Sequence, residues 1–251
     1  MEFNGKRVLV TGSTRGIGRA TAELFVARGA RVAINGRDAA AVATACNEIG
    51  TDKTVPVPGD LSSVAACESM VADAVGALGG LDILVNNAGA FAILSIADSD
   101  EAAWDRLNDT NVKAVFFTSR AALPALRASK GNIVNVGSTA GLAGDHNISI
   151  YCSTKGAVVN MTRAFAQELA PDIRVNCVCP GVIDTDMGRM NVAMMGQGAT
   201  AADLGALYPL ARIGTAAEVA FAIGYLASPH AAFITGQALA LDGGVLSADS
   251  A

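Results

Sequence analysis

A tyrosine and a lysine four residues apart are the clearest candidates for acid–base chemistry in this chain. Tyr151 and Lys155 lie at the start of a predicted helix, where residues with this spacing project from the same face. An ammonium group favours the phenolate form of a neighbouring phenol, and lowering a phenol pKa from about 10 towards neutrality needs roughly 4 kcal/mol. A partly desolvated lysine together with a cationic cofactor ring supplies an interaction of that size. An isolated pair with this spacing is also typical of an ordinary exposed helix face.

A glycine-rich turn follows the first predicted strand and reads Thr11-Gly12-Ser13-Thr14-Arg15-Gly16-Ile17-Gly18. Gly12 permits a tight turn, Gly16 lets backbone amides approach a pyrophosphate, and Gly18 lets the following helix pack closely on the sheet. The amino terminus of that helix favours an anion. The spacing Gly-x-x-x-Gly-x-Gly differs from the common dinucleotide fingerprint, so glycines that serve only a tight turn are the alternative interpretation.

Two further strand ends carry polar side chains. Asn86-Asn87-Ala88-Gly89 follows one apolar run, and Ser138 follows another, thirteen residues before Tyr151. Ligands bind at the carboxyl ends of the strands in parallel sheets, so we expect these groups at one edge. The Ser138 hydroxyl could donate a hydrogen bond to a substrate oxygen there. An asparagine-rich turn without a ligand is the alternative for residues 86–89.

The elements that must position these residues alternate along the whole chain. Short β-branched runs predict strands at 7–11, 31–34, 54–57, 81–86, 132–136, 173–179 and 238–241. Ala-rich stretches predict helices at 16–28, 38–49, 62–78, 100–128, 151–170 and 216–227. This alternation is typical of an α/β fold with a parallel sheet covered on both faces. We therefore expect residues 1–251 to form one dinucleotide-binding and catalytic domain.

The segment 182–214 interrupts this alternation. It is rich in Met and Gly, has weak periodicity, and is longer than a compact domain leaves irregular unless the segment covers a site. We expect it to be a mobile lid over the substrate. Its flexible apolar side chains suit an apolar ligand, a hydrophobic core or a subunit interface equally well. They belong to Met187, Met190, Met194 and Met195.

The composition limits the class of protein. Of the 251 residues, 51% are apolar and only 16% are charged, so most of the chain must be buried and intrinsic disorder is excluded. No apolar run approaches the roughly 18 residues of a membrane helix, and the amino terminus has no leader pattern, so we expect a cytoplasmic protein. The net charge of -5 has no basic blocks and argues against nucleic-acid binding. Two histidines and five cysteines, unclustered in the sequence, predict no metal site and reduced thiols.

Taken in order, the motifs resemble those of the short-chain dehydrogenase/reductases over about residues 6–244. The resemblance implies a Rossmann fold whose seven-stranded parallel sheet has the order 3-2-1-4-5-6-7, with helices on both faces. The matching residues are the turn at 11–18, Asp60-Leu61, the motif at 86–89, Asn111, Ser138, Tyr151, Lys155, and the segments 180–185, 209–214, 234–237 and 242–244.

The resemblance implies hydride transfer between a nicotinamide and a ketone or secondary alcohol. Tyr151 would be the general acid or base, and Lys155 would lower its pKa and bind the nicotinamide ribose. Ser138 would hydrogen-bond the substrate oxygen, and Asn111 would hold a water that links Lys155 to solvent. The other implied cofactor contacts are Gly12, Ser13, Thr14, Arg15, Gly16, Ile17 and Gly18 at the pyrophosphate, Asp60 and Leu61 at the adenine, Asn87, Ala88 and Gly89 after the fourth strand, and Pro180, Gly181, Val182, Ile183 and Thr185 around the nicotinamide.

The end of the second strand bears on the choice of cofactor. NAD enzymes usually offer an acidic side chain to the ribose here, but the segment reads Ile34-Asn35-Gly36-Arg37-Asp38, with Gly36 at the acidic position. Arg37 and Arg15 could surround a 2′-phosphate. Asp38 is expected to be a helix N-cap, although it could also turn towards the ribose. We expect NADP(H), with NAD(H) as the alternative.

The sequence leaves the substrate open. Among relatives, a 3-oxoacyl carrier-protein reductase needs cations for its acidic carrier, which Arg127 and Lys130 could supply, but Pro171-Asp172 stands where such relatives commonly have a basic residue. We therefore favour a free small or medium ketone or alcohol. The motifs are also compatible with an NAD(H)-dependent alcohol dehydrogenase, a catalytically silent nucleotide sensor, or an epimerase or dehydratase. The family resemblance further implies a homotetramer formed through the helices at 100–128 and 151–170 and the last strand.

Overall fold

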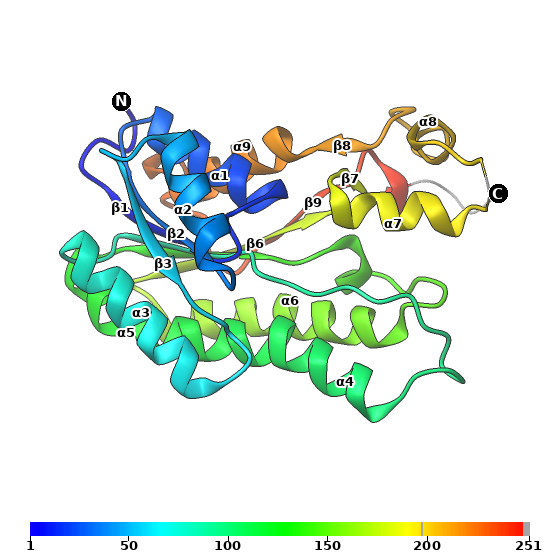
Figure 1. The fold of residues 1–251 in the computed structure, drawn as a ribbon, viewed down its shortest axis with the longest axis horizontal. Helices are drawn as coiled ribbons and strands as arrows, with labels where there is room; N and C mark the ends of the chain where they lie inside the picture. Colours follow the sequence, from blue (N-terminus) through cyan, green and yellow to red (C-terminus); the bar gives the residue numbers. More distant parts are fainter. Residues whose placement is uncertain (197, 248–251) are drawn as a thin grey trace.

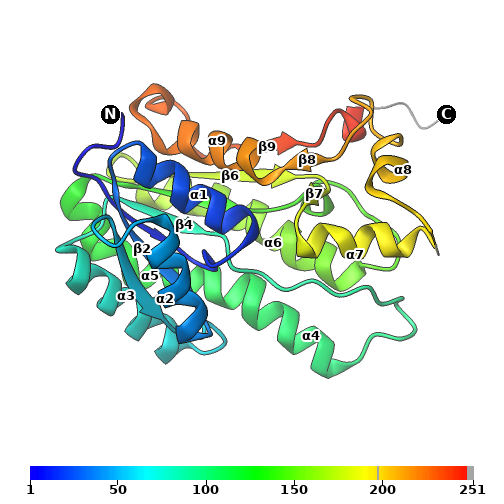
Figure 2. The same ribbon diagram turned by 45° about the horizontal axis from the view of Figure 1, so that its top comes forward.

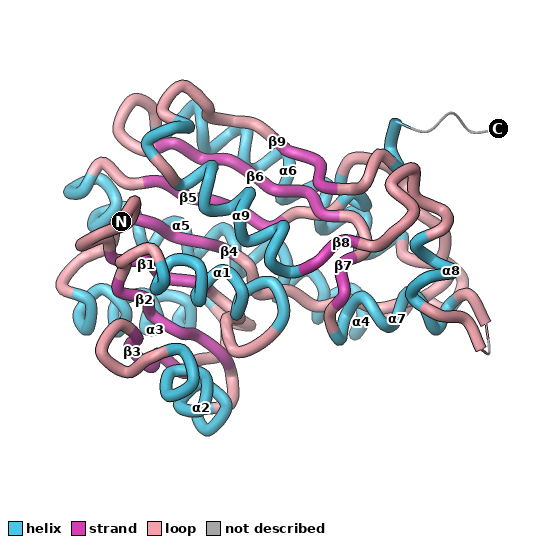
Figure 3. Tube along the Cα trace, turned by 90° about the horizontal axis from the view of Figure 1, so that it is seen from above, coloured by secondary structure: helices cyan, strands magenta, loops and turns pink. Residues whose placement is uncertain are grey.

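A parallel sheet of seven strands forms the centre of the structure, a computed structural model that describes residues 1–196 and 198–247 apart from the side chains of residues 193 and 194. The strand order is β3-β2-β1-β4-β5-β6-β9, and all neighbouring pairs are parallel (Figure 3). Because β7 and β8 pair outside this sheet, the predicted order 3-2-1-4-5-6-7 is confirmed. The strands are β1 (Arg7–Val10), β2 (Arg31–Gly36), β3 (Thr54–Pro58), β4 (Ile83–Asn86), β5 (Asn132–Val136), β6 (Arg174–Pro180) and β9 (Ala238–Leu241).

Helices cover both faces of the sheet (Figures 1 and 2). One face carries α1 (Gly16–Ala27), α2 (Ala39–Ile49) and α9 (Ala216–Ala227), and the other carries α3 (Val64–Leu78), α5 (Ala114–Ser129) and α6 (Ser149–Leu169). Each face forms its own apolar cluster. The central strands are apolar on both sides for this reason, and all residues of β4 and β5 are buried.

The prediction of one continuous helix at 100–128 is wrong at residues 109–113. The structure has α4 (Glu101–Asn108), then a π-helical turn (Asp109–Lys113), then α5. A π turn contains one residue more than an α turn and changes which side chains face inwards. Asn111 lies in this turn and is fully buried. The interruption therefore directs a polar side chain towards the carboxyl ends of the strands.

The segment 182–214 contains regular elements that its weak periodicity did not predict. They are β7 (Ile183–Asp184), α7 (Asp186–Met194), α8 (Ala201–Gly205) and β8 (Gly214–Thr215). The two strands pair in parallel, so the two ends of the segment lie side by side. In Figures 1 and 3, α7 and α8 extend beyond one end of the sheet. Elements of two to nine residues are too short to leave a clear apolar period.

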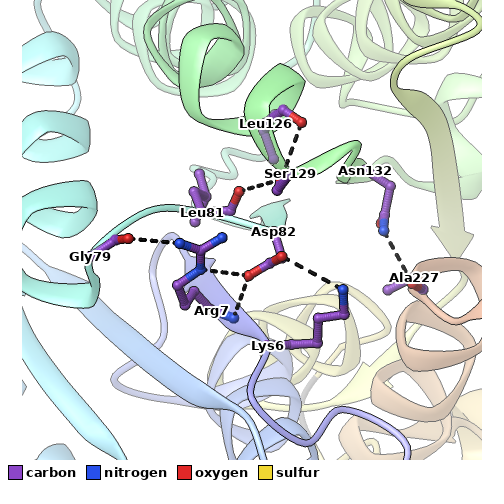
Figure 4. Close-up of polar contacts among 9 residues, drawn as sticks. All are labelled: Lys6, Arg7, Gly79, Leu81, Asp82, Leu126, Ser129, Asn132 and Ala227. Carbon is purple, nitrogen blue, oxygen red and sulfur yellow. Dashed lines mark hydrogen bonds and ion pairs between the residues drawn. The ribbon is translucent and has the colours of Figure 1, made fainter.

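At the amino-terminal end of the sheet, Asp82 joins the start of β4 to the start of β1 (Figure 4). Its carboxylate accepts hydrogen bonds from the backbone nitrogen of Arg7 at 2.9 Å and from Nε of Arg7 at 2.7 Å. Lys6 Nζ lies 3.6 Å from the other oxygen. Burial raises the pKa of Asp82, but the hydrogen bonds and charges of Arg7 and Lys6 outweigh burial and hold that pKa below its usual value.

Replacing this carboxylate tests its contribution to stability. We expect Asp82→Asn to lower the free energy of unfolding at pH 7 by about 1–3 kcal/mol, because charge-assisted hydrogen bonds at a buried group are lost. The folded pKa of Asp82 is depressed, so its stabilising effect is complete above the unfolded pKa of about 4 and is lost as the pH falls through the folded value. Denaturant unfolding at pH 7 and near pH 3 should show the difference shrinking in acid. Asp73→Asn on the exposed face of α3 is the control, and an equal loss at both pH values would contradict the argument.

Candidate active site

The glycine turn depends on a very close approach of α1 to the end of β1. A Cβ at Gly18 would lie 2.3 Å from the Gly12 carbonyl oxygen and 2.4 Å from Asn87 Nδ2. The Asn87 amide donates hydrogen bonds to the carbonyl oxygens of Thr11 and Gly12 at 2.9 and 3.0 Å. Gly12 has a φ of +62°, and its added Cβ would lie 2.9 Å from Ala88 Cα. The glycine turn and the motif at 86–89 therefore form one interlocked unit.

Two side chains that hold this unit were not singled out in the sequence. Thr11 Oγ1 accepts hydrogen bonds from the backbone nitrogens of Asn87 and Ala88 at 2.9 and 3.0 Å. Asn35 Oδ1 accepts one from the Gly12 nitrogen at 3.2 Å. Ser13 belongs to the same network, because its hydroxyl accepts a hydrogen bond from the Asn35 nitrogen at 3.0 Å. The sequence did contain a signal for both residues. Thr11 and Asn35 are polar residues at the carboxyl ends of two neighbouring apolar strands.

Tyr151 lies in the first turn of α6 and is 9% exposed. The ring of Phe91 contacts the phenol edge-on, with 4.9 Å between ring centroids and an angle of 87° between the ring planes. Burial raises the pKa of Tyr151 to about 12, and hydrogen bonding by Ser138 opposes this rise. Ser138 itself caps a short turn by accepting a hydrogen bond from the Ala140 nitrogen at 3.1 Å. A protonated phenol and a hydroxyl thus lie together at this edge of the sheet.

Lys155 lies one turn further along α6 and is 5% exposed. Its Nζ donates a hydrogen bond to the Val136 carbonyl oxygen at 2.9 Å and lies 5.7 Å from the centroid of the Tyr151 ring. Burial lowers the pKa of Lys155 to about 8. In the chain alone, burial shifts both groups towards their neutral forms. A lowered Tyr151 pKa would need a further positive charge besides that of Lys155.

Asn111 links the loop after β4 to α6. Its Oδ1 accepts a hydrogen bond from the Ala90 nitrogen at 2.7 Å, and its Nδ2 donates to the Ala90 oxygen at 2.9 Å and to Thr154 Oγ1 at 3.1 Å. A Cβ on Gly89 would lie 3.4 Å from Asn111 Oδ1 and 3.7 Å from Lys155 Nζ. The polar ends of Asn111 and Lys155 thus both lie next to Gly89. Phe91 and Thr154 are further residues here that sequence reasoning missed, since Phe91 lies outside the motifs and Thr154 is a variable position between Tyr151 and Lys155.

The segment 180–185 faces the glycine turn. A Cβ on Gly16 would lie 3.4 Å from Thr185 Cγ2. The Thr185 hydroxyl donates to the Ile183 oxygen at 3.2 Å and accepts from the Gly188 nitrogen at 3.1 Å. The Gly181 nitrogen donates to the Leu241 oxygen at 3.0 Å, which ties the start of the segment to β9. Two backbone segments suited to close approach by a ligand therefore lie opposite each other.

A side chain at residue 36, at the end of β2, would displace the side chain of Thr14. A Cβ on Gly36 would lie 2.8 Å from Thr14 Cγ2 and 3.3 Å from a methyl of Val42. The prediction that Asp38 is a helix N-cap is confirmed, because its carboxylate accepts hydrogen bonds from the nitrogens of Ala40 and Ala41. This carboxylate is therefore already engaged with α2.

The two arginines expected near a 2′-phosphate are exposed and lie on different turns. Hydrogen bonding by Ser62, together with the charge of Arg37, lowers the pKa of Asp60. Arg15 forms an ion pair with Asp186 of α7, with 3.7 Å between Nη1 and Oδ2. Leu61 is buried, and its nitrogen donates to Asp60 Oδ1 at 2.8 Å. Both guanidinium groups thus have a carboxylate neighbour in the structure.

Two negative observations concern residues 1–196 and 198–247. In this part of the chain no group of three or more His, Cys, Asp or Glu side chains is arranged to hold a metal ion. None of its helices combines the length and the apolar character needed to cross a membrane.

Comparison with known proteins decides the family. A family model described as enoyl-(acyl carrier protein) reductase matches residues 12–246. A crystal structure from Brucella melitensis, described as a short-chain dehydrogenase/reductase of the glucose/ribitol dehydrogenase type, superposes with a TM-score of 0.91 and is 36% identical, covering 97% of this chain and 98% of that chain. The chain belongs to the short-chain dehydrogenase/reductase family.

Relatives of this short-chain dehydrogenase/reductase act on different substrates. One, 38% identical over 95% of both chains, is 2-(S)-hydroxypropyl-CoM dehydrogenase 3 of Xanthobacter autotrophicus. Another, 35% identical over 98% of this chain and 99% of its own length, is the 3-oxoacyl-[acyl-carrier-protein] reductase FabG of Vibrio cholerae. The protein is therefore an NAD(P)-dependent oxidoreductase acting on CH–OH groups or the corresponding carbonyls.

The close approach at Gly18 can be tested against a second glycine. We expect Gly18→Ala to lower the free energy of unfolding by about 1–3 kcal/mol, because the new methyl would overlap Gly12 and Asn87. Gly76→Ala is the matched control, since it lies on the exposed face of α3 with nothing within 4 Å of its added Cβ, and it should stabilise by about 0.5–1 kcal/mol. Denaturant unfolding of both variants gives the comparison. A Gly18→Ala protein as stable as the wild type would refute the contact.

Proposed function

We propose that the enzyme catalyses NADP(H)-dependent hydride transfer between a nicotinamide and a ketone or secondary alcohol, with Tyr151 as general acid and base. The observation that carries this proposal is the meeting of a buried phenol, a hydroxyl and a buried ammonium at the carboxyl edge of the sheet, from Tyr151, Ser138 and Lys155. Phe91 covers one side of the phenol. The geometry suits proton transfer to an oxygen in a site shielded from water.

The residues present fit a dinucleotide. The turn at 12–18 packs closely on residues 87 and 88 through Gly12 and Gly18, and α1 begins at Gly16 within this turn. The amino terminus of α1 would receive the pyrophosphate. The segment 180–185 lies opposite and would hold the nicotinamide, with the Thr185 hydroxyl near its carboxamide. Leu61 with Asp60 would contact the adenine, and residues 87–89 would line the middle of the site. When bound, the nicotinamide would supply or accept the hydride.

The proton would move through the residues of the chain. In the reductive direction Tyr151 gives its proton to the carbonyl oxygen as the carbonyl carbon receives the hydride, and Ser138 donates a hydrogen bond to the same oxygen. A phenol with a pKa of about 12 is protonated at neutral pH and is ready to act as an acid. Lys155, whose pKa is about 8, is largely charged at pH 7 and would stabilise the phenolate that forms, besides binding the nicotinamide ribose. Asn111 would hold a water through which Lys155 and Tyr151 regain the proton.

The choice of NADP(H) rests on the end of β2. Gly36 offers no carboxylate, and the Asp38 carboxylate is engaged as a helix cap. Arg37 and Arg15 are exposed and available to a 2′-phosphate, for which Arg15 would exchange its weak surface pair with Asp186. NAD(H) is the alternative.

An uncharged ketone or alcohol of small to medium size fits the surroundings of Tyr151 best. Phe91, Ile93 and Ile148 pack with Tyr151 in one apolar cluster. Met187 and Met190 on α7 and Met195 after it are exposed at the end of the sheet where we propose that residues 182–214 form a substrate lid, while the side chain of Met194 lies outside the described residues. Reduction of 3-oxoacyl groups on a carrier protein is the second candidate, favoured by the Vibrio cholerae relative.

We also propose that the protein assembles as a homotetramer and acts in the cytoplasm. Large apolar side chains are exposed on the helices expected to mediate assembly, among them Trp104 and Phe116, which are 50% and 41% exposed. Burial of such side chains between subunits is typical of obligate interfaces. The single large sheet supports the proposal that residues 1–251 form one domain.

Removing the phenol hydroxyl tests the mechanism. We expect Tyr151→Phe to lower kcat by at least about 100-fold for every ketone that the wild type reduces, because general acid catalysis is lost while the ring and its contact with Phe91 remain. The assay follows oxidation of the reduced nicotinamide with ketones, β-ketoesters, acyl thioesters and cyclic diketones. Tyr225→Phe, on the surface of α9, is the control. Activity retained in Tyr151→Phe would remove Tyr151 from the mechanism.

Removing Arg37 tests the cofactor proposal. We expect the wild type to prefer NADPH, and Arg37→Ala to lower kcat/KM with NADPH by about 10- to 100-fold, which corresponds to one charge-assisted interaction with a phosphate. kcat/KM with NADH should change little, because NADH lacks the 2′-phosphate. Arg106→Ala, an exposed arginine of α4, is the control. A wild-type preference for NADH would overturn the proposal.

A further inference from the structure

Both polar backbone groups of Val182 are bonded to the far end of the 182–214 segment. The Val182 nitrogen donates a hydrogen bond to the Tyr208 hydroxyl, with 3.0 Å between the atoms. The Val182 oxygen accepts one from the Gly214 nitrogen, also at 3.0 Å. The chain leaves the sheet after Pro180, and the side chain of Tyr208, 26 residues beyond Val182, binds the Val182 backbone.

The ring of Tyr208 occupies a space that two glycines leave open. A Cβ on Gly181 would lie 3.2 Å from Tyr208 Cε1, and a Cβ on Gly243 would lie 3.3 Å from Tyr208 Cδ1. The ring is half-buried between these two backbone segments. Burial raises the pKa of Tyr208, and the hydrogen bond that its oxygen accepts from Val182 opposes this rise. The hydroxyl is thus aimed at Val182 by packing on both sides of its ring.

Packing alone does not fix the Val182 backbone. A cavity of about 180 Å³ lies beside it, lined by Val182, Ile183, Tyr208, Val219 and Leu241 among others. A backbone next to a cavity can shift without displacing a packed neighbour. The hydrogen bond from Val182 to Tyr208 therefore restrains this position, together with the pairing of β7 and β8 and the bond from the Gly181 nitrogen to the Leu241 oxygen.

The backbone of Tyr208 is in turn tied to α8. Its nitrogen donates to the Gly205 oxygen at 3.0 Å, and its oxygen accepts from the Ala211 nitrogen at 2.8 Å. A Cβ on Gly205 would lie 2.8 Å from Arg212 Cα, so the end of α8 packs directly on the returning chain. A displacement of α8 must consequently move Tyr208, and with it the partner of the Val182 nitrogen.

We propose that Tyr208 is a positioning residue whose hydroxyl couples the 182–214 segment to the loop at 180–185 that would hold the nicotinamide. With α8 in the observed place, Val182 is held and the loop is shaped for the dinucleotide. When α8 moves away, the hydrogen bond breaks, the loop relaxes towards the cavity, and the dinucleotide is held less tightly. This inference rests on the proposed function, because it takes the role of the loop from there.

Tyr208→Phe is the direct test, because it keeps the ring between Gly181 and Gly243 and removes only the hydroxyl. In the protein without dinucleotide, we expect faster hydrogen exchange in the peptide that contains Val182. We expect the dissociation constant for NADPH, measured by fluorescence, to rise about 3- to 10-fold, the size of one net hydrogen bond. kcat at saturating NADPH should fall by a smaller factor than the dissociation constant rises. Tyr225→Phe is the matched control and should change neither quantity.

The outcomes separate this inference from the proposed function. A wild type that binds neither NADPH nor NADH contradicts the proposed function. A wild type that binds NADPH, with a Tyr208→Phe variant of equal affinity and equal exchange at Val182, overturns the role of Tyr208. A variant with unchanged affinity but a large loss of kcat also overturns it, since the hydroxyl would then act in the chemistry.

Discussion

Burial of the Lys155 ammonium is the constraint on which the rest of the site depends. A charge removed from water costs several kcal/mol unless hydrogen bonds and nearby groups compensate it. The Val136 carbonyl supplies one such bond at the end of β5. Gly89 and Gly141 bring backbone close to the same lysine, since a Cβ at residue 141 would lie 2.6 Å from its carbonyl oxygen. The ends of the neighbouring strands and α6 must therefore pack closely around Lys155. This packing also sets the position of Tyr151, which lies on the same helix.

The two ends of the sheet use polar groups for different purposes. At the amino-terminal end, the Asp82 carboxylate and Arg7 tie the starts of β4 and β1 together. Near the carboxyl end, buried amides form a ladder in which Asn86 Nδ2 donates to Asn135 Oδ1 at 2.9 Å, and Asn135 Nδ2 donates to the Thr162 hydroxyl at 2.9 Å. This ladder joins β4 and β5 to α6, the helix that carries Tyr151 and Lys155. It gives the edge a fixed geometry without placing charge in the core.

The alternation of strands and helices, the cover on both faces of the sheet and the turn at 11–18 were predictable from the residues, because they follow from periodicity and from the local conformational needs of glycine. The strand order was predictable only through the family resemblance. The sequence was not sufficient for contacts between residues distant along the chain. Phe91 against Tyr151, Thr154 against Asn111 and Tyr208 against Val182 leave no periodic trace. The break in the helix at 109–113 was missed because a single π turn hardly alters the apolar pattern. The place of Gly36 was recognised, but the Thr14 methyl that fills its space was not.

The π turn makes the chain length between α4 and α5 part of the site. A regular α-helix turns by about 100° per residue, so deletion of one residue from 109–113 would rotate all of α4 relative to α5 by about that angle. Asn111 would then leave the Ala90 backbone, and the loop after β4 would lose its tether. If α4 or α5 were replaced by a helix from a related enzyme, a matching apolar face alone would not reproduce the rotation that the π turn introduces. The replacement has to preserve the number of residues across the turn more than their types.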